Sequence, residues 1–389
     1  LSSSQLMVIS PGIPVDAPFT DVVRNAGIPI WSEIELAYHY GKGKIAAITG
    51  TNGKTTTTAL VGEIVKAHNA KTIVVGNIGI PYTELCDTTD DDSDTVAEIS
   101  SFQLETVIDF HPNVSAILNL TPDHLNRHYT FENYGNVKFS ITKNQTMDDV
   151  TVLNYDDEHT RAMGEKAKDH CHVVYFSRLE KPAGGVYVED GDIILEDGDK
   201  KINVLAIKDL KLMGAHNVEN VLAAVGISYY MGVPVDVIRD VATSFKAVAH
   251  RIEYVDTVDG VAYYNDSKGT NPDAAIKGIQ AMVAPTFLIG GGYDKGSEYD
   301  EWIEAFDGKV KWLVLIGQTA QKIADCAKRH GFNSIIFEEN LQDAVAYCHE
   351  NAVDGDAVLL SPACASWGQF DNYEQRGDMF KEYVRSYKE

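Results

Sequence analysis

The sequence predicts an α/β fold made of two units, each built on a mostly parallel sheet. Short, β-branched apolar runs alternate with helix-length stretches from residue 44 onward and again after residue 250. Runs of this kind are typical of strands that are buried on both faces of a parallel sheet. Between about 171 and 212 the pattern changes to short alternating segments with acidic turns, which predicts antiparallel hairpins appended to the first sheet.

Residues 1–40 predict two short strand–helix pairs that precede the first unit. A strand at Leu6–Ile9 is followed by a turn at "SPGIP" and a helix near Thr20–Ala26. A second strand and helix follow around Ile28–Tyr40. This stretch is too short to close a core of its own.

The first unit begins at "KIAAIT" (44–49), an apolar run that ends in a Gly-rich turn. "TTTTALVGEIVKAH" follows with helical periodicity, and a later helix is expected from His216 to Tyr230. The other parallel strands of this unit are expected at Thr72–Val75, Thr95–Ile99, Val114–Leu118 and Val150–Asn154.

A second, Rossmann-like α/β unit is expected after a boundary near residue 247. Five apolar runs occur there, and each but the last precedes a helical segment. They are "GVAYYND", "APTFLIGGG", "VKWLVLIG", "SIIFE" and "DAVLLSP".

Composition narrows the class of protein. The chain has 389 residues, of which 44% are hydrophobic and 23% charged, as in ordinary globular proteins of two or three domains. A net charge of -24 argues against nucleic-acid binding by charge alone. Five scattered cysteines without a C-x-x-C pair predict reduced thiols in a cytoplasmic protein. No apolar run is long enough for membrane insertion.

The strongest local motif is "TGTNGKTTT" at 49–57. A strand that leads through a Gly-rich turn into a helix directs backbone N–H groups at phosphate oxygens, so a P-loop-type domain is predicted. Lys54 would neutralise phosphate charge, and the Thr55 hydroxyl would be a ligand of Mg²⁺. The strict G-x-x-x-x-G-K-[ST] spacing fails because Ile48 stands at the first glycine. The residues expected to bind ATP here are Gly50, Thr51, Asn52, Gly53, Lys54, Thr55 and Thr56.

Other polar groups also follow predicted strands. Glu98 in "EISSFQLE" is a candidate second Mg²⁺ ligand, although a lone Glu there is more often a helix-start residue. "TPDHLNRH" (121–128) offers Asp123, His124 and Arg127. Three later segments are each, taken singly, better explained as caps or turns: "MGAHNVEN" (213–220), "AHR" (249–251) and "NDSKGTNP" (265–272). In a fourth, "SPACASWGQFDNYEQRG" (361–377), small residues permit a ligand to approach the backbone closely, although a tight loop would need them too.

In their order and spacing these motifs resemble those of the Mur ligases, the ATP-dependent amide ligases of peptidoglycan precursor synthesis. "GTNGKTT", "GNIG" (76–79), "EISSFQLE", "DHLNRH", "GAHNVEN", "HR" and "NDSKGTNP" carry the resemblance, which covers nearly the whole chain. "SSFQLE" with "LLSPACASWGQFDNYEQRG" looks like the branch that adds D-glutamate to UDP-N-acetylmuramoyl-L-alanine. The resemblance implies that ATP phosphorylates the substrate carboxylate and that the amine of D-glutamate attacks the acyl phosphate.

The resemblance also assigns roles to residues. Lys54, Glu98, His124 and Lys138 match catalytic positions, and Thr55, Glu98, His124 and Lys138 match the holders of two Mg²⁺ ions, with Lys138 carbamylated. Without the resemblance, Lys138 in "YGNVKFS" would be interpreted as a solvated helix residue. Asn217 and Asn220 match positions near the nucleotide base, and Arg251 and Asp266 match its phosphate and ribose contacts. Asn77, Ser100, Gln103 and His124 match positions facing the UDP-linked substrate, and Lys268, Thr270, Lys295, Ser366 and Tyr373 match the D-glutamate pocket.

The resemblance implies a domain map, and the sequence departs from the family pattern in two ways. Residues 1–39 match only the last part of an N-terminal UDP-binding domain, most of which is expected to be missing; residues 40–246 match the central ATP-binding domain and 247–389 the domain for the incoming amino acid. Asn126 stands where an Asp is familiar, and "GGGYDKG" leaves the role of Asp294 open. A monomer is expected.

Three alternatives stay open at this point. The chain could be a sister ligase or a folylpolyglutamate synthetase-like enzyme, which would carry a different loop in place of "SPACASWGQF". It could be a non-catalytic nucleotide-binding paralogue, although Lys54, Glu98, His124 and Lys138 are all intact. A bare P-loop ATPase or kinase would turn over ATP without an amine acceptor.

Overall fold

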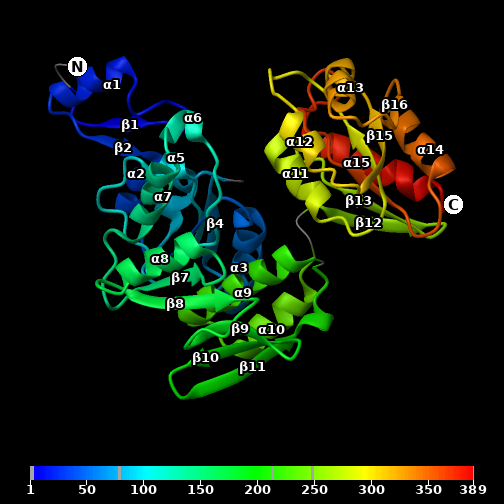
Figure 1. The fold of residues 1–389 in the computed structure, drawn as a ribbon. Helices are drawn as coiled ribbons and strands as arrows, with labels where there is room; N and C mark the ends of the chain where they lie inside the picture. The colour runs from blue at the N-terminus through cyan, green and yellow to red at the C-terminus, as the bar shows by residue number, and fades with distance from the viewer. Residues whose placement is uncertain (1–3, 78–79, 213, 247–248, 389) are drawn as a thin grey trace. The chain divides into compact units, whose positions relative to one another are not determined.

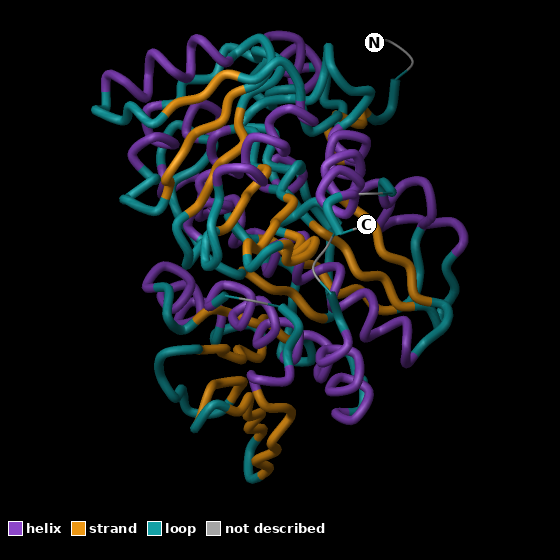
Figure 2. Tube along the Cα trace, turned by 90° about the vertical axis from the view of Figure 1, so that its right-hand side faces the viewer, coloured by secondary structure: helices purple, strands orange, loops and turns teal. Residues whose placement is uncertain are grey.

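The computed structural model describes residues 4–77, 80–212, 214–246 and 249–388. The chain divides into two compact units, residues 1–246 (blue to green in Figure 1) and 247–389 (yellow-green to red). In each unit, strands lie between helices (Figure 2). The structure is therefore α/β with mainly parallel sheets, as the alternation of apolar runs predicts.

Unit 1 contains a nine-stranded sheet in the order β11-β10-β9-β8-β7-β6-β3-β5-β4. The four strands expected after "KIAAIT" are confirmed and pair in parallel. Five of the six residues of β3 are buried, because helices cover both faces of the sheet. The parallel strands with predicted positions are β3 (Lys44–Thr49), β4 (Thr72–Gly76), β5 (Asp94–Glu98), β6 (Val114–Ile117) and β7 (Val150–Asn154).

The antiparallel prediction for residues 171–212 is right only in part. β9 (Gly185–Glu189), β10 (Asp192–Asp197) and β11 (Lys200–Ala206) form an antiparallel meander at the edge of the sheet. β8 (His172–Ser177), however, continues the parallel part, and β9 pairs with it in parallel through two residues. The alternating pattern could not reveal this switch, because it sets the face of each side chain and not the strand direction.

Helices cover both faces of the first sheet. α3 (Lys54–His68), α9 (Ala215–Tyr230) and α10 (Val235–Ser244) pack together over one face, and the helix expected from His216 is confirmed as α9. The other face forms a core with α2 (Glu33–Tyr40), α4 (Tyr82–Leu85), α5 (Ser101–Leu104), α7 (Phe131–Phe139) and α8 (Glu158–Ala167). α6 (Leu125–His128) is a single turn that contacts α7.

Residues 4–40 form the two predicted strand–helix pairs. β1 (Met7–Ile9) and β2 (Ile30–Ser32) pair in parallel in a sheet of their own, and α1 (Pro18–Asn25) lies between them in sequence. The expectation that this stretch is too short to close a core of its own is wrong, because the β1–β2 pair and α1 bury four apolar side chains against one another. These side chains, Ile9, Val23, Ile28 and Ile30, make a small separate core. α2 follows directly from β2 and joins the core of the main sheet.

Unit 2 contains a six-stranded sheet in the order β12-β13-β17-β14-β15-β16. The five predicted strands are confirmed as parallel neighbours. They are β13 (Val261–Asn265), β14 (Thr286–Gly290), β15 (Val310–Leu315), β16 (Ile335–Phe337) and β17 (Ala357–Leu360). Two elements were not expected: β12 (Glu253–Val258), which pairs antiparallel with β13 at the edge, and α15 (Tyr373–Ser386), which follows β17 after a long loop.

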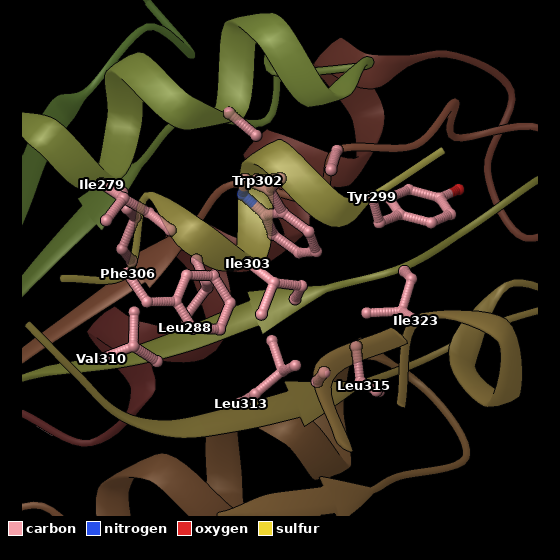
Figure 3. Close-up of a cluster of buried hydrophobic side chains, with 14 of the residues drawn as sticks. Ile279, Leu288, Tyr299, Trp302, Ile303, Phe306, Val310, Leu313, Leu315 and Ile323 are labelled. Atoms are coloured by element: carbon pink, nitrogen blue, oxygen red, sulfur yellow. The ribbon is translucent and has the colours of Figure 1, made fainter. Parts of the chain in front are cut away.

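The core of unit 2 lies on both faces of its sheet. α11 (Pro272–Gln280), α12 (Asp300–Glu304) and α13 (Ala320–Arg329) pack on one face. The fully buried ring of Trp302 lies there among aliphatic and aromatic side chains (Figure 3). α14 (Leu341–Asn351) and α15 pack on the other face. Among the described residues, no helix is long and apolar enough to cross a membrane. All five cysteines are free and buried.

Candidate active site

The candidate residues of unit 1 meet at the carboxyl edge of its sheet. β6, β3, β5 and β4 are consecutive parallel neighbours, so the segments that follow them start at one edge. These segments are the loop 50–53 after β3, Asn77 after β4, Glu98 at the end of β5 and residues 118–124 after β6. The topology therefore assembles motifs that lie far apart in sequence, from residue 50 to residue 124.

The glycine-rich loop has the shape that a phosphate-binding turn requires. Gly50 and Gly53 adopt φ angles of 147° and 83°. A side chain at Gly53 would also collide with Asn220, since a Cβ there would lie 2.2 Å from its Oδ1. α3 begins at Lys54, so the N-terminus of a fifteen-residue helix faces this loop.

Asn119 holds the loop from the neighbouring strand end. Its backbone O accepts from Thr51 N at 3.0 Å, its Oδ1 accepts from Asn52 N at 2.8 Å, and its Nδ2 donates to Asn52 O at 3.1 Å. The Thr51 hydroxyl lies 3.1 Å from the Tyr134 hydroxyl. Sequence reasoning missed Asn119, although an Asn directly after the apolar run "AIL" was a visible signal.

Lys54 and Lys138 converge on one backbone carbonyl. Lys54 Nζ donates to Gly50 O and Thr51 O, each at 2.9 Å. Lys138 Nζ donates to the same Gly50 O at 2.9 Å and to Thr49 Oγ1 at 3.2 Å. Lys138 is thus brought to the loop from α7, as the resemblance implied and the local pattern did not.

Lys138 is a buried amine, only 2% exposed. Burial lowers the pKa of Lys138 well below its ordinary range, and the nearby charge of Lys54 lowers it further. The carboxylates of Asp123 and Glu98 oppose this shift more weakly. The lowered pKa favours the unprotonated form of this amine, which is the form that can accept CO2.

Glu98 presents a buried carboxylate oxygen to the same region. The side chain is 2% exposed, and its Oε1 accepts from Asn77 Nδ2 at 3.0 Å. Its Oε2 is buried and has no hydrogen-bond partner among the described residues. Because an orphaned carboxylate oxygen is costly to bury, the site suits a cation that this oxygen would bind. The hydroxyl of half-buried Thr55 adds a second hard oxygen donor of the kind Mg²⁺ prefers.

His124 lies at the exposed rim of this edge. Its side chain is 50% exposed and its Nε2 lies 3.5 Å from Asp123 Oδ2. Its backbone has a left-handed φ of 53°, and its ring packs 4.9 Å from the ring of Phe102. The side chain of Asn126 lies outside the described residues.

A buried ion pair fixes the segment that carries His124. Arg127 Nη2 lies 2.6 Å from Glu105 Oε2, with both side chains largely buried. His128 Nε2 lies 3.0 Å from Ser101 Oγ, which joins the same two segments a second time. Burial lowers the pKa of His128 and so favours the neutral form of its ring. Glu105 and His128 were missed because their role depends on tertiary contacts that no local pattern records.

The candidates for the UDP-linked substrate are partly engaged in local structure. Ser100 and Gln103 form a capping box at the start of α5. Gln103 Nε2 also donates to Glu33 Oε1, and burial raises the pKa of Glu33. These contacts fix α5, and thereby the chain directly after Glu98.

Asn217 and Asn220 extend the loop's surroundings from α9. Asn220 Oδ1 accepts from Thr57 Oγ1 at 3.3 Å, and its Nδ2 donates to Asn217 Oδ1 at 3.1 Å. Asn220 also lies against Gly53, as its distance to a Cβ there shows. The structure therefore places both asparagines beside the N-terminal end of α3.

Unit 2 brings Arg251 and Asp266 together at the end of β13. Arg251 Nη1 lies 4.0 Å from Asp266 Oδ1, and Ser361 Oγ donates to Asp266 Oδ2 at 2.7 Å. Asp266 is fully buried, and this burial raises its pKa to about 6 against the opposing effect of Arg251. The residues thus form a compact polar cluster where two parallel strands end.

Three loops of unit 2 meet because β13, β17 and β14 are adjacent in the sheet. Buried Arg376 links the first two: its Nε donates to Ser267 Oγ at 2.9 Å and its Nη1 to Cys364 O at 3.2 Å. A bridge between Tyr293 and Ala365 links the second and third loops. Arg376 was missed as a candidate because only the fold reveals that it is buried.

The remaining candidates lie on these three loops and on α15. Lys268 Nζ lies 5.8 Å from the ring centroid of Tyr373, whose pKa burial raises to about 12. Ser366 is buried, Thr270 is half-buried, and Lys295 is exposed on the loop after β14. Asp294 Oδ1 accepts from Gly296 N at 2.7 Å, which gives it a turn-stabilising contact.

Comparison with known proteins identifies the family. Residues 48–228 match the Mur ligase middle domain, and residues 250–364 match the Mur ligase glutamate ligase domain. The UDP-N-acetylmuramoylalanine--D-glutamate ligase of Lachnospira eligens is 58% identical over 386 residues, 99% of this chain and 85% of that protein. The protein of the same name from Lachnoclostridium phytofermentans is 53% identical over 388 residues, 100% of this chain and 85% of that protein.

Solved structures show the same fold at low sequence identity. The UDP-N-acetylmuramate-alanine ligase of Thermotoga maritima has a TM-score of 0.64 at 20% identity, covering 99% of this chain and 86% of its own. A MurF ligase from Thermotoga maritima, solved in complex with ADP, has a TM-score of 0.63 at 17% identity, covering 99% of this chain and 96% of its own. With both domains of the family matched and relatives more than half identical along its length, the chain belongs to the Mur ligase family.

Proposed function

We propose that this protein is an ATP-dependent ligase that joins D-glutamate to UDP-N-acetylmuramoyl-L-alanine. The observation that carries the proposal is the meeting of Lys54, Lys138 and Glu98 at the carboxyl edge of the first sheet. The 58% identity to a D-glutamate ligase supports the choice of substrates. An ATPase or kinase without an amine acceptor would not need the loops assembled in unit 2.

In the proposed reaction, the γ-phosphoryl group of ATP passes to the carboxylate of the UDP-linked substrate, and ADP leaves. The amine of D-glutamate attacks the carbonyl carbon of the acyl phosphate, loses a proton and displaces inorganic phosphate. This chemistry demands positioning and charge neutralisation more than covalent help from the protein. The amides of residues 50–53, the N-terminus of α3 and the Lys54 ammonium supply that environment.

Mg²⁺ fits the donors of unit 1. Thr55 and Glu98 would hold one ion, and His124 and Lys138 would serve a second. When bound, Mg²⁺ neutralises phosphate charge. The buried, unpaired Oε2 of Glu98 supports this assignment, because it lacks a hydrogen-bond donor among the described residues.

Lys138 is proposed to act as a carbamate. Its neutral amine adds to CO2, forms an N–C bond and releases one proton to solvent, which turns an amine into a carboxylate. The lowered pKa of Lys138 favours this step because only the unprotonated amine is nucleophilic. The product would be an anionic oxygen donor close to the loop. It would also remove the repulsion between the two amines of Lys54 and Lys138, which both contact Gly50 O.

The remaining roles follow the family and are proposals for this chain. Residues 40–246 would bind ATP, with the nucleotide also contacted by Asn217, Asn220, Arg251 and Asp266. Residues 1–39 would belong to the UDP-binding part, and Asn77, Ser100, Gln103 and His124 would face the UDP-linked substrate. Residues 247–389 would bind D-glutamate through Lys268, Thr270, Lys295, Ser366 and Tyr373. Cationic and hydroxyl donors suit its two carboxylates. A monomer with reduced thiols in the cytoplasm is proposed.

Amino-acid selectivity tests the proposal. ADP release is measured with UDP-N-acetylmuramoyl-L-alanine and, in parallel, D-glutamate, L-alanine or meso-diaminopimelate. The proposal predicts turnover that depends on D-glutamate. Turnover with only one of the other two amino acids would assign the chain to a sister activity and refute the choice of substrate.

A further inference from the structure

Three side chains of types that can ligate a metal lie together in unit 2, on α12, on α13 and at the C-terminal cap of α13. The helices α12 and α13 contact each other (Figure 1). Asp300, Cys326 and His330 each offer one ligand atom, and these three atoms lie within 4.8 Å of one another. Cys326 lies on α13, and His330 is the residue that caps the C-terminal end of this helix. The backbone N–H of His330 still donates to Cys326 O at 3.2 Å, so the two residues are one helical turn apart. None of the three belongs to the proposed substrate or ATP residues.

The donor set is of the type that zinc prefers. A thiolate, an imidazole nitrogen and a carboxylate oxygen suit Zn²⁺, whose tetrahedral ligands stand about 3–4 Å apart. His330 Nε2 and Asp300 Oδ1 are 2.9 Å apart, so the pair needs to open by only a few tenths of an ångström. Two anions and a neutral imidazole would balance the charge of the ion.

The second ring nitrogen of His330 has a suitable partner. Its Nδ1 lies 3.6 Å from Glu304 Oε1, one turn along α12 from Asp300. A carboxylate that faces Nδ1–H fixes the tautomer whose Nε2 lone pair is available to a metal. This arrangement distinguishes the group from a simple surface ion pair.

One contact competes with a metal. Arg329 Nη2 lies 3.2 Å from Asp300 Oδ1, and this ion pair together with the His330 contact lowers the pKa of Asp300. The Arg329 side chain is 60% exposed, so it can leave for solvent at small cost.

The described residues contain a second group of similar donors, but its buried carboxylate already has other hydrogen-bond partners. Glu35, His39 and Asp109 also lie within 4.8 Å of one another. The two carboxylate oxygens of buried Glu35, however, already accept the backbone N–H groups of Ile108, Asp109 and Phe110. That carboxylate is satisfied without an ion, whereas Asp300 is held only by side chains that can move.

We propose that Asp300, Cys326 and His330 form a binding site for a zinc-type divalent metal, with water as the fourth ligand. Binding displaces the thiol proton of Cys326 to solvent. His330 binds through Nε2 as the unprotonated ring nitrogen, and the single ring proton is then carried on Nδ1, which faces Glu304 Oε1. Burial raises the pKa of the Cys326 thiol, so metal affinity rises with pH. The ion would clamp α13 to the start of α12, directly after the loop that carries Lys295.

Cobalt absorption tests the proposal on the full chain. Co²⁺ titrated into the metal-free protein should bind with a sulfur-to-cobalt charge-transfer band and with tetrahedral d–d bands, and Zn²⁺ should displace it. Cys326→Ser should abolish the charge-transfer band, and Cys86→Ser, a buried thiol of unit 1, should keep it. The Mg²⁺ site proposed in unit 1 contains no thiol, so failure of one proposal leaves the other intact.

Two further variants keep the test decisive if Cys326→Ser folds poorly. His330→Asn should weaken Co²⁺ binding by about tenfold or more. Arg329→Gln keeps all three ligands and removes the competing cation, so it should bind Co²⁺ more tightly than the wild type. Absence of the charge-transfer band in the wild type, or its survival in Cys326→Ser, would overturn the proposal. So would affinities that neither His330→Asn nor Arg329→Gln changes.

Discussion

Replacing Lys138 with methionine isolates the energetic effect of one buried amine beside the phosphate loop. Methionine keeps much of the length and apolar volume of the lysine and removes its titration. The lost hydrogen bonds to Gly50 O and Thr49 Oγ1 cost about 1–3 kcal/mol, an amount that does not depend on pH.

The pH dependence carries the quantitative prediction. The folded pKa of Lys138 lies well below that of the unfolded chain, about 10.4. Between these two pKa values the unfolded chain binds one proton more than the folded protein, so stability rises with pH and is lost as pH falls. The slope is about 1.4 kcal/mol per pH unit for one such group. Lys138→Met should remove this pH-dependent contribution to the free energy of unfolding. As pH falls, the stability of the variant should therefore rise relative to that of the wild type.

The difference in unfolding free energy between the two proteins is measured by urea unfolding, with hydrogen–deuterium exchange of unit 1 peptides as the readout. The buffers are free of CO2 and range from neutral to mildly alkaline pH. Lys143→Met is the matched control, because Lys143 is exposed and contacts only backbone carbonyls. Bicarbonate should stabilise the wild type and leave Lys138→Met unchanged, since only the buried amine can form the carbamate. Equal pH slopes for wild type and Lys138→Met would refute the account of a neutral, buried amine.

Four other changes have defined outcomes. Glu98→Gln removes the unpaired carboxylate oxygen. The variant should lose Mg²⁺-dependent turnover, and in the absence of Mg²⁺ its unfolding midpoint should rise. Turnover with unaltered Mg²⁺ dependence would contradict the role of Glu98 as a Mg²⁺ ligand. Gly53→Ala places a Cβ 2.2 Å from Asn220 Oδ1 at a φ of 83°. Titration calorimetry should show that ATP affinity falls about tenfold or more, because the loop must shift. A variant that binds ATP with wild-type affinity would contradict this loop geometry. The pKa of Asp266 is raised to about 6, so unit 2 should lose stability as pH rises from about 4 to about 6. Asp266→Asn should flatten this part of the plot of urea midpoint against pH. If the slope persists in the variant, Asp266 is not the group that causes it. Trp302→Ala empties the centre of the core in Figure 3 and should lower the unfolding free energy of unit 2 by about 3–5 kcal/mol; a loss below about 1 kcal/mol would show that the core collapses around the gap.

The parallel strands were predictable because burial on both faces demands uninterrupted apolar runs. β3 illustrates this, since its sequence "KIAAIT" is buried from Ile45 to Thr49. β12 was not predictable in the same way: "EYVDTV" lies at the sheet edge, is mostly half-exposed and carries acidic residues. The parallel pairing of β8 with β9 was hidden for a different reason, because alternation is compatible with either strand direction.

The site shows a similar division. Glu98 ends β5, and Lys54 begins the helix that follows the loop after β3. Their meeting followed from the rule that parallel strands end at one edge of the sheet. Lys138 sits on α7, where the local sequence indicates an ordinary surface lysine, and only tertiary packing turns its amine inward to Gly50 O. Arg376 and the pair of Glu105 with Arg127 were beyond local reasoning as well, because their partners are distant in sequence or on other elements.

The most direct test of the central claim follows one oxygen atom through the reaction. UDP-N-acetylmuramoyl-L-alanine labelled with ¹⁸O in its carboxylate is incubated with the protein, ATP, Mg²⁺ and D-glutamate, and the released phosphate is analysed by mass spectrometry. Ligation through an acyl phosphate predicts that each phosphate carries one ¹⁸O and that its release depends on D-glutamate. Unlabelled phosphate, formed at the same rate without D-glutamate, would identify simple ATP hydrolysis and contradict the proposed ligase.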